Sequence, residues 1–431
     1  MNPLLESFAT AFDVDPARRP QLDDAIRDGL PGSRDEAWKY TSLRALERRG
    51  FTPAREIPAL DPSLLADIPS PRMVFVNGLY SDALSDLSTL PKGIELVQLS
   101  QQLAGRDASP REGLPQRTTH PHTVLQRRFM HAREVFARLN GALANEGVLL
   151  YVGNEVRAGR PLHLVFIAGE DTTDRAWHHR HLFDIRHEAS LTLLEHHISV
   201  GDAPHLGNTV VHVHLKQGAT LRHARIQNHA AAMVSLLRTD AVLASDSHYQ
   251  RLDLELGAKL TRHELNVRLE GDNARLQANG VLLGNALRHV DTRLSIEHIA
   301  RNTACELSWR GVAGDRSRVV FHGGIHIRQS AGGSDANLSN KNLLLSADAE
   351  VDTQPVLEID ADEVKAAHGA TVGQLDPTAL FYLRSRGIPE AQAQQLLTAA
   401  FCREPLAIGG EAIAEALTRQ LDGSLEKAGM A

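Results

Sequence analysis

Histidine is the residue type whose number and spacing first suggest chemistry. The chain of 431 residues has 22 histidines against five tyrosines and five methionines, and they are densest between His178 and His229. Imidazole nitrogens are common ligands of transition metals. His212 and His214 are separated by a single residue, so in a β-strand both rings would lie on one side and could bind one metal ion. This pair is the sharpest metal-site candidate that spacing alone provides.

The residues around that pair favour a structural role instead. A metal site of the cupin type would need a glutamate soon after His214, but Leu-Lys-Gln-Gly follows, although His223 is available farther on. Polar residues stacked along the outside of a β-solenoid would explain the two histidines without a metal. The groups at residues 178–181 and 196–197 are likewise expected at the surface. A histidine cluster flanked by basic residues is also a poor site for a divalent cation, because the positive charges oppose the metal.

The sequence lacks the motifs of several enzyme classes. It contains no Gly-x-x-x-x-Gly-Lys-Ser/Thr loop for ATP and no Gly-x-Ser-x-Gly nucleophile turn. Its net charge is −7 and no long basic run occurs, which disfavours nucleic acid as a partner. The first residues lack the apolar core of a signal peptide, and no uncharged apolar run reaches the roughly 18 residues of a membrane span. These features predict a soluble cytoplasmic protein.

The two cysteines, Cys305 and Cys402, lie far apart in the sequence. They form neither a disulfide framework nor a Cys-x-x-Cys pair, which is typical of a protein from a reducing compartment. Cys305 falls in a strand pattern and Cys402 in a helical one, so both are expected to be small buried residues.

The middle of the chain has the pattern of short β-strands. Apolar and polar residues alternate over short runs, which indicates half-buried strands. The alanine-x-leucine phrase returns at irregular intervals, starting at Ala189, Ala219, Ala258 and Ala274. Strand–turn units without helices between them predict a β-solenoid or a large sandwich rather than an α/β sheet. The alternating runs are residues 162–167, 191–194, 210–215, 252–256, 265–269 and 294–298.

Both ends of the chain have helical patterns. The sequence therefore predicts an N-terminal helical region with a short strand and a linker at residues 1–145, a β core at residues 146–374 and a C-terminal helical domain at residues 375–431. The short strand is expected at residues 73–78, which end in Asn-Gly, and a further helix at residues 122–143.

The C-terminal region is expected to contain three helices. Asp376 and Pro377 are the residue types that cap and begin a helix, and Gly387 is placed to end it. Two further helices are predicted to begin near Pro389 and Glu411.

Residues 321–387 closely resemble the SufB/SufD family of iron–sulfur cluster assembly proteins. The resemblance rests on Phe-His-Gly-Gly-Ile-His-Ile at 321–327, Ser-Asp-Ala-Asn-Leu-Ser-Asn-Lys-Asn at 334–342 and Val-Lys-Ala-Ala-His-Gly-Ala-Thr-Val-Gly at 364–373. It implies a right-handed parallel β-helix flanked by helical domains. The resemblance is closer to the SufD branch than to the SufB branch. Two features favour SufD, namely the sequence Glu-Ala-Trp-Lys-Tyr-Thr at residues 36–41 and the scarcity of cysteine.

The same resemblance singles out His368. The family segment reads Val-Lys-Cys-Ser-His-Gly-Ala-Thr-Val-Gly, so His368 is kept here while Ala366 replaces the cysteine. In the family, the β-helices of SufB and SufD meet near this segment and share a site for the nascent cluster. The resemblance therefore implies His368 as a cluster-binding residue and candidate iron ligand. Clusters are held mainly by thiolates, so two distant cysteines could not hold one unaided and the partner chain would have to supply them.

The resemblance also implies partners. These are a SufB-type paralogue and a SufC-type ATPase that docks on the C-terminal helices, with iron or a cluster bound only transiently in the complex. Tyr382, Arg384 and Arg386 fall in that region, and Tyr382 and Arg386 would share a helix face, while Phe381 is expected in the core. A homodimer of the isolated chain is an open alternative, whereas nucleic acid and membrane are not expected.

Three functions are thus open from the sequence. The first is a non-catalytic scaffold subunit for cluster assembly. The second is a histidine-dependent metal enzyme with a β fold, built on His212 and His214. The third is a β-helix enzyme acting on polysaccharide, which would need a row of acidic and basic residues along a groove and an export signal that the sequence does not offer.

Overall fold

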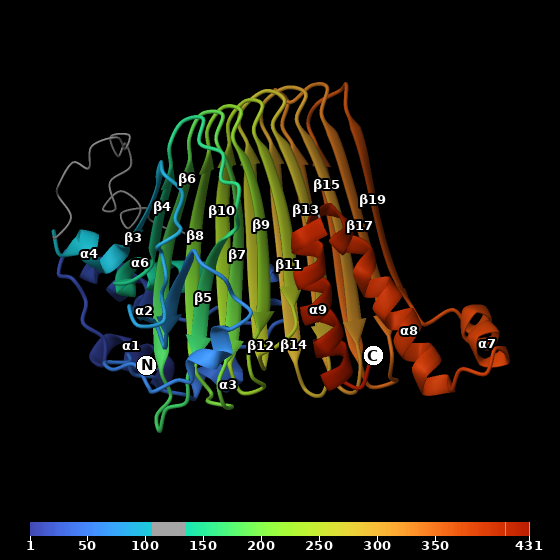
Figure 1. The fold of residues 1–431 in the computed structure, drawn as a ribbon, viewed down its shortest axis with the longest axis horizontal. Coiled ribbons are helices and arrows are strands. Elements are labelled where there is room, and N and C mark those ends of the chain that lie inside the picture. Colours follow the sequence, from blue (N-terminus) through green and yellow to red (C-terminus); the bar gives the residue numbers. More distant parts are fainter. Residues whose placement is uncertain (106–130, 132–133, 410, 431) are drawn as a thin grey trace.

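A computed structural model gives the fold and describes residues 1–105, 131, 134–409 and 411–430. Two sheets made mostly of parallel strands run through the middle of the chain as a β-solenoid (Figure 1). One sheet contains β5 (Leu162–Ala168), β7 (Ser190–Ser199), β9 (Thr220–Asn228), β11 (His248–Glu255), β13 (Arg275–Gly284), β15 (Ala304–Ala313), β17 (Asp335–Leu344) and β19 (Lys365–Gly373). The other contains β4 (Val148–Val152), β6 (Ala176–Ile185), β8 (Leu206–Leu215), β10 (Val234–Leu243), β12 (Leu260–Leu269), β14 (His289–His298), β16 (Arg318–Ile327) and β18 (Glu350–Ile359).

Successive strands alternate between the two sheets, so each coil gives one strand to each sheet. Neighbouring coils are in register: Arg251 lies opposite Ala278 and Leu307 opposite Leu338, offsets of 27 and 31 residues. Many of the corners are turned by residues with positive φ, such as Asn273 at 62°, a backbone region that asparagine tolerates better than most residues. The prediction of a parallel β-solenoid is confirmed.

The N-terminal end of the solenoid is extended by short strands and covered by helices. β1 (Arg72–Val76) pairs with β5 and turns through Asn77 and Gly78 into β2 (Leu79–Tyr80), while β3 (Ile94–Gln98) pairs with β4. The strand and turn expected at residues 73–78 are therefore present. The helical elements here are α1 (Pro3–Thr10), α2 (Arg19–Asp28), η1 (Glu36–Trp38), α3 (Arg44–Glu47), η2 (Pro62–Leu65), α4 (Leu99–Leu103) and α6 (Val135–Leu143). α6 is the last part of the helix predicted at residues 122–143, of which residues 122–130 and 132–133 lie outside the described residues.

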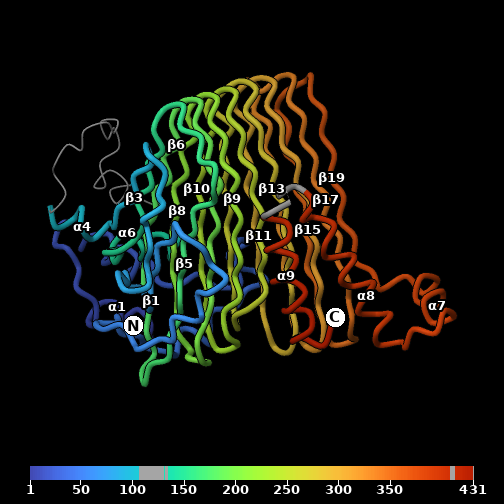
Figure 2. The backbone as a smooth tube through the Cα atoms, viewed as in Figure 1, coloured from blue at the N-terminus to red at the C-terminus, as the bar shows by residue number. Residues whose placement is uncertain are grey.

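The C-terminal elements are α7 (Pro377–Ser385), α8 (Glu390–Arg403), η4 (Glu404–Gly409) and α9 (Glu411–Lys427), which confirms the three predicted helices. Asp376 caps α7, its carboxylate accepting a hydrogen bond from the backbone N–H of Thr378 at 2.8 Å. α8 and α9 fold back over the outer face of the sheet that contains β11 and β13 (Figure 2). Among the described helices, none has both the length and the apolar character to cross a membrane.

Candidate functional site

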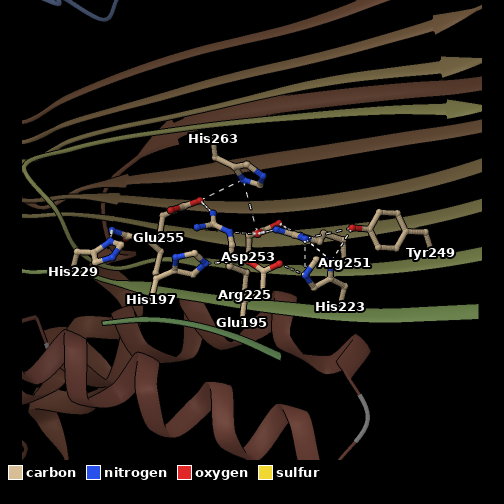
Figure 3. A network of polar contacts seen from close by, with 11 residues as sticks. Glu195, His197, His223, Arg225, His229, Tyr249, Arg251, Asp253, Glu255 and His263 are labelled. Carbon is tan, nitrogen blue, oxygen red and sulfur yellow. Dashed lines mark hydrogen bonds and ion pairs between the residues drawn. The ribbon is translucent and has the colours of Figure 1, made fainter. Parts of the chain in front are cut away.

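The interior of the solenoid is polar in its middle coils. On β11, Tyr249 belongs to the interior core, whereas Leu252 and Leu254 pack outward against the C-terminal helices. Since side chains alternate along a strand, Arg251, Asp253 and Glu255 share the inward phase of Tyr249. All are buried. Residues of β7, β9 and β12 meet them in one network of polar contacts (Figure 3).

Asp253 is the centre of this network. Arg251 donates to both of its carboxylate oxygens, from Nε at 2.9 Å and from Nη2 at 2.7 Å. Arg225 donates from Nε to Asp253 at 3.0 Å and from Nη2 to Glu255. The Nδ1 atom of His263 lies 3.3 Å from Glu255. Two buried guanidinium groups are thus neutralised by two buried carboxylates, the arrangement that makes burial of charge tolerable.

A second carboxylate cluster adjoins the first. Glu195 lies 2.7 Å from Nε2 of His223 and 3.0 Å from Nε2 of His197. Burial raises the pKa of Glu195, but contact with the two histidines outweighs burial and holds that pKa well below its usual range. Burial and the neighbouring Arg251 lower the pKa of His223 to about 4. At neutral pH Glu195 is therefore ionised and His223 is a neutral donor.

Three ligand atoms in this network could in principle hold a metal ion. One atom each from Asp253, Glu255 and His263 lies within 4.8 Å of the others, the one such group among the described residues. Both oxygens of Asp253 are already bonded to arginine, and Arg225 holds one oxygen of Glu255. An ion would have to displace a guanidinium group and would sit beside two positive charges. The residues therefore fit an internal ion-pair network better than a metal site.

The structure corrects the expected positions of the clustered histidines. His178, His179, His181 and His197 are buried rather than at the surface, and His196 is half-buried. His178 packs edge-on against Phe8 at 5.0 Å between ring centroids. The N-terminal helices cover His178 on the outer face of β6. His179, His181 and His197 instead lie in the solenoid interior, where each packs against Phe166.

His212 and His214 face outward, because Val211 and Val213 between and beside them belong to the interior core. His212 is nevertheless buried and His214 is half-buried. Within the part of the chain that the structure describes, no third ligand joins them in a metal-binding group. The enzyme hypothesis built on this pair has no support in the geometry.

Both cysteines are buried, as predicted. Burial raises the pKa of the Cys305 thiol and of the Cys402 thiol to about 12, so both are protonated at neutral pH. Cys305 lies in the interior core, and Cys402 lies on α8 in the cluster that packs the C-terminal helices against the sheet. Because metals bind the thiolate, neither side chain is available as a ligand in this state.

His368 lies on β19, the last strand of its sheet, and is exposed. It is opposite Leu338, an interior residue, so its side chain has the inward phase at the open end of the solenoid. Along the same line, Arg251, Ala278, Leu307 and Leu338 precede it on β11, β13, β15 and β17. Three apolar layers thus separate His368 from the polar network. Ala366, two residues earlier, packs against the interior core.

The helix α7 extends away from the solenoid (Figure 1) and has no buried residue. Tyr382 is 56% exposed and Phe381 is 72% exposed, so the prediction that Phe381 belongs to the core is wrong. Arg386 lies over the ring of Tyr382, 5.2 Å from its centroid, as their spacing predicted. Arg384 is 3.4 Å from Glu390. α7 is therefore an exposed aromatic and basic surface.

Comparison with known proteins agrees with this architecture. The family model for "SUF system FeS cluster assembly, SufBD core domain" matches residues 166–401. The iron–sulfur cluster assembly protein SufD of Escherichia coli is 34% identical over 90% of this chain and 88% of its own length. A SufBD family protein of Synechocystis is 28% identical over 88% of this chain and 83% of its own.

The similarity extends to the other branch of the family. The iron–sulfur cluster assembly protein SufB of Bacillus subtilis is 28% identical over 62% of this chain and 57% of its own length. The matched core spans most of the solenoid and reaches β19 and α8. The chain therefore belongs to the SufBD family of SUF-system iron–sulfur cluster assembly proteins.

Proposed function

We propose that this chain is a non-catalytic, SufD-like scaffold subunit that pairs with a SufB-type paralogue and binds a SufC-type ATPase in the cytoplasm. The observation that carries the proposal is the open C-terminal end of the solenoid. β18 and β19 each end their sheet, and none of their residues is buried. Solenoid ends normally require a cap, because a terminal coil exposes apolar side chains and unpaired backbone groups.

A paralogue with the same fold is the natural cap. Leu357, Val351 and Ala366 are partly buried residues that pack on the interior core from this last coil, and a second solenoid would cover them. In the isolated chain a second copy could occupy the same place, which would give a homodimer.

His368 would lie inside that interface, close to the partner's last coil. Its exposed imidazole can provide one nitrogen ligand to iron or to a nascent cluster, and the buried thiols of this chain leave the sulfur ligands to the partner. The cluster is the cargo of the complex and not a resident cofactor. On this proposal the chain positions a ligand and catalyses no reaction itself.

Replacing His368 with alanine is expected to lower cluster yield at least ~10-fold in the reconstituted three-protein complex, the range seen when a metal-site residue is lost. Iron and sulfide content after reconstitution measures the effect. Because His368 is exposed, the complex itself should still form, as gel filtration with light scattering would show. The control is His187→Ala, an exposed histidine at a corner of an earlier coil. Equal yields from the wild type and His368→Ala would refute the role of His368.

The α7 helix is the proposed docking surface for the ATPase. It contacts the rest of the chain mainly through α8 and presents Phe381 and Tyr382 to solvent. Exposed aromatic side chains beside arginines are typical of the residues that dominate binding energy in protein interfaces.

The variant Phe381→Ala/Tyr382→Ala is expected to weaken binding of the SufC-type ATPase by ~30-fold or more, the effect of losing a hot spot worth about 2 kcal/mol. Surface plasmon resonance with the ATPase from the same organism measures it. Leu287→Ala serves as the control, because Leu287 is also an exposed apolar residue (67% exposed) but lies outside α7. A double variant that binds as tightly as wild type would show that α7 is not the docking surface.

A further inference from the structure

A groove on the outer face of the second sheet has no role in the proposed scaffold function. It has a volume of about 660 Å³ and lies over β10, β12, β14 and β16, beside η1 and the start of α6. Its lining is dominated by charged side chains of both signs. A smaller pocket of about 250 Å³ adjoins it and shares Arg293 and His322.

A ladder of charged residues forms the floor of this groove. Arg238, Glu264, Arg293 and His322 lie directly opposite one another on four successive strands. Neighbouring strands are about 4.8 Å apart, so each side chain is within reach of the next. The ladder would neutralise itself if each arginine bonded to an acid beside it.

The other arginines of the groove do have acidic partners. Arg238 is 2.9 Å from Glu134 and 3.0 Å from Asp240. Arg262 is 2.7 Å from Glu264. Arg268 is paired with Glu270 and Glu297 at the exposed edge. These ion pairs use the carboxylates that line the groove.

Among the described arginines that line the groove, Arg293 is the one without a directly bonded acidic partner. Its guanidinium group makes no hydrogen bond and no ion pair with any of the described residues, although its side chain is only partly exposed. Glu264, the acid beside it in the ladder, is held by Arg262 through two nitrogens. Burial lowers the pKa of Arg293 and the positive charge of Arg262 lowers it further, whereas Asp291, Glu264 and Glu36 raise it. These carboxylates lie near the half-buried guanidinium group, but none of them forms a direct ion pair with it.

His322 adds a second unsatisfied group at the same place. Its Nδ1 atom is buried and has no hydrogen-bond partner among the described residues. Burial lowers the pKa of His322 and the adjacent Arg293 lowers it further, whereas a hydrogen bond to the backbone carbonyl of Leu294 raises it. The single N–H of the neutral ring is used in that bond, so Nδ1 is an acceptor and can accept a hydrogen bond from a hydroxyl group of the ligand, such as that of hydrogen phosphate or citrate.

We propose that Arg293 and His322 form a binding site for the oxyanion group of a small molecule, a phosphate or a carboxylate. The planar guanidinium matches two oxygens of either group, and a buried charge-assisted hydrogen bond is stronger than a neutral one. The groove volume lies within the usual range for small-molecule sites, about 300–1,000 Å³. The paired arginines around it would position the rest of the ligand without adding net charge. This site is independent of the scaffold proposal, because His368 lies on the other sheet.

Titration calorimetry of the full chain with inorganic phosphate and, separately, with citrate tests the site. Binding of either probe at millimolar concentration is expected, and the better probe identifies the phosphate or the carboxylate as the recognised group. The variant Arg293→Gln should weaken that binding at least ~10-fold, since a hydrogen bond to a charged group contributes that much. His322→Gln should weaken it to a lesser extent. Arg316→Gln, at an exposed arginine on a corner outside the groove, should bind like wild type.

Thermal unfolding with and without the probe distinguishes a loss of binding from a loss of stability in a variant. A ligand that binds the folded state raises the melting temperature, so the probe should stabilise wild type and Arg316→Gln but not Arg293→Gln. No binding of either probe to wild type would overturn the proposal, and so would equal binding by wild type and Arg293→Gln.

Discussion

Lowering the pH from about 6.5 to about 5.5 is expected to reduce the free energy of unfolding by at least about 3 kcal/mol. Three fully buried histidines that the fold keeps neutral supply this minimum, and further buried histidines such as His181 act in the same direction. Burial lowers the pKa of His178 to about 3 and, with smaller contributions from neighbours, that of His179 and His223 to about 4. Each contributes about 1 kcal/mol over this interval, because the unfolded histidine is only half protonated at its own pKa of about 6.5, and the contribution approaches about 1.4 kcal/mol per pH unit at lower pH.

The sign follows from which state binds the proton. Below an unfolded-state pKa of about 6.5 the unfolded chain binds protons at these histidines while the folded chain does not, so acid favours unfolding. The loss continues until the folded-state pKa values near 3 and 4 are reached. The carboxyl group of Glu195, whose pKa is lowered by its histidine contacts, acts in the same direction but only below about pH 4.5.

Urea unfolding at a series of pH values measures this dependence. His178→Gln removes one titrating group and should reduce the loss of stability between pH 6.5 and 5.5 by about 1 kcal/mol, whatever it does to stability at pH 7. His187→Gln, at an exposed histidine, should leave this loss unchanged. A free energy of unfolding that is constant between pH 6.5 and 5.5 would contradict the burial of neutral histidines.

Sequence patterns predicted a β-solenoid or a large sandwich, the family resemblance selected the parallel β-helix, and neither predicted the repeat length. Alternation over short runs without helices between them specifies strand–turn units, and the sheets follow from these. The alanine-x-leucine phrase seemed irregular because it mixes the two sheets: Ala189, Ala219 and Ala274 precede strands of one sheet, whereas Ala258 precedes β12 of the other. Separated by sheet, the coils repeat every 26 to 33 residues.

The polar interior could not be predicted because alternation does not say which phase faces inward. In residues 252–256 the leucines suggest the core and the acids suggest the solvent. The opposite holds: Leu252 and Leu254 face the C-terminal helices, and Asp253 and Glu255 face the interior. One feature of the sequence could have indicated the inward phase: Arg225, on the neighbouring strand, lies directly opposite Asp253 and has the complementary charge.

The candidate partner surfaces were harder still to judge from the sequence. Phe381 has the residue type of a core position, but α7 has no neighbour in this chain that would bury it. His368 could be selected only through the family resemblance, because a single histidine in a loop-like sequence has no distinctive pattern. On the proposed function, both residues belong to surfaces that another chain covers, and a single sequence cannot show such a surface.

Replacing Asp253 with alanine is expected to lower the free energy of unfolding by about 3–5 kcal/mol, the cost of breaking a buried ion pair from one side. The variant would leave Arg251 with no acidic partner and would remove one of the two carboxylates that hold Arg225. Both guanidinium groups are fully buried, so water cannot replace the lost carboxylate. Urea unfolding at neutral pH measures the loss, and Asp362→Ala, at an exposed position near β19, is the control.

The double variant Arg251→Met/Asp253→Leu separates the charge from the packing. It removes one cation together with one anion and leaves Arg225 paired with Glu255, so it should be more stable than Asp253→Ala alone. Replacing both members of a buried ion pair by apolar side chains of similar volume often changes the free energy of unfolding little. Removing only one member leaves the other as an isolated buried charge, which is strongly destabilising. If Asp253→Ala lost less than about 1 kcal/mol, the interior would have to admit water or a counterion. The solenoid would then contain a hydrated channel rather than the dry network that the hydrogen bonds describe.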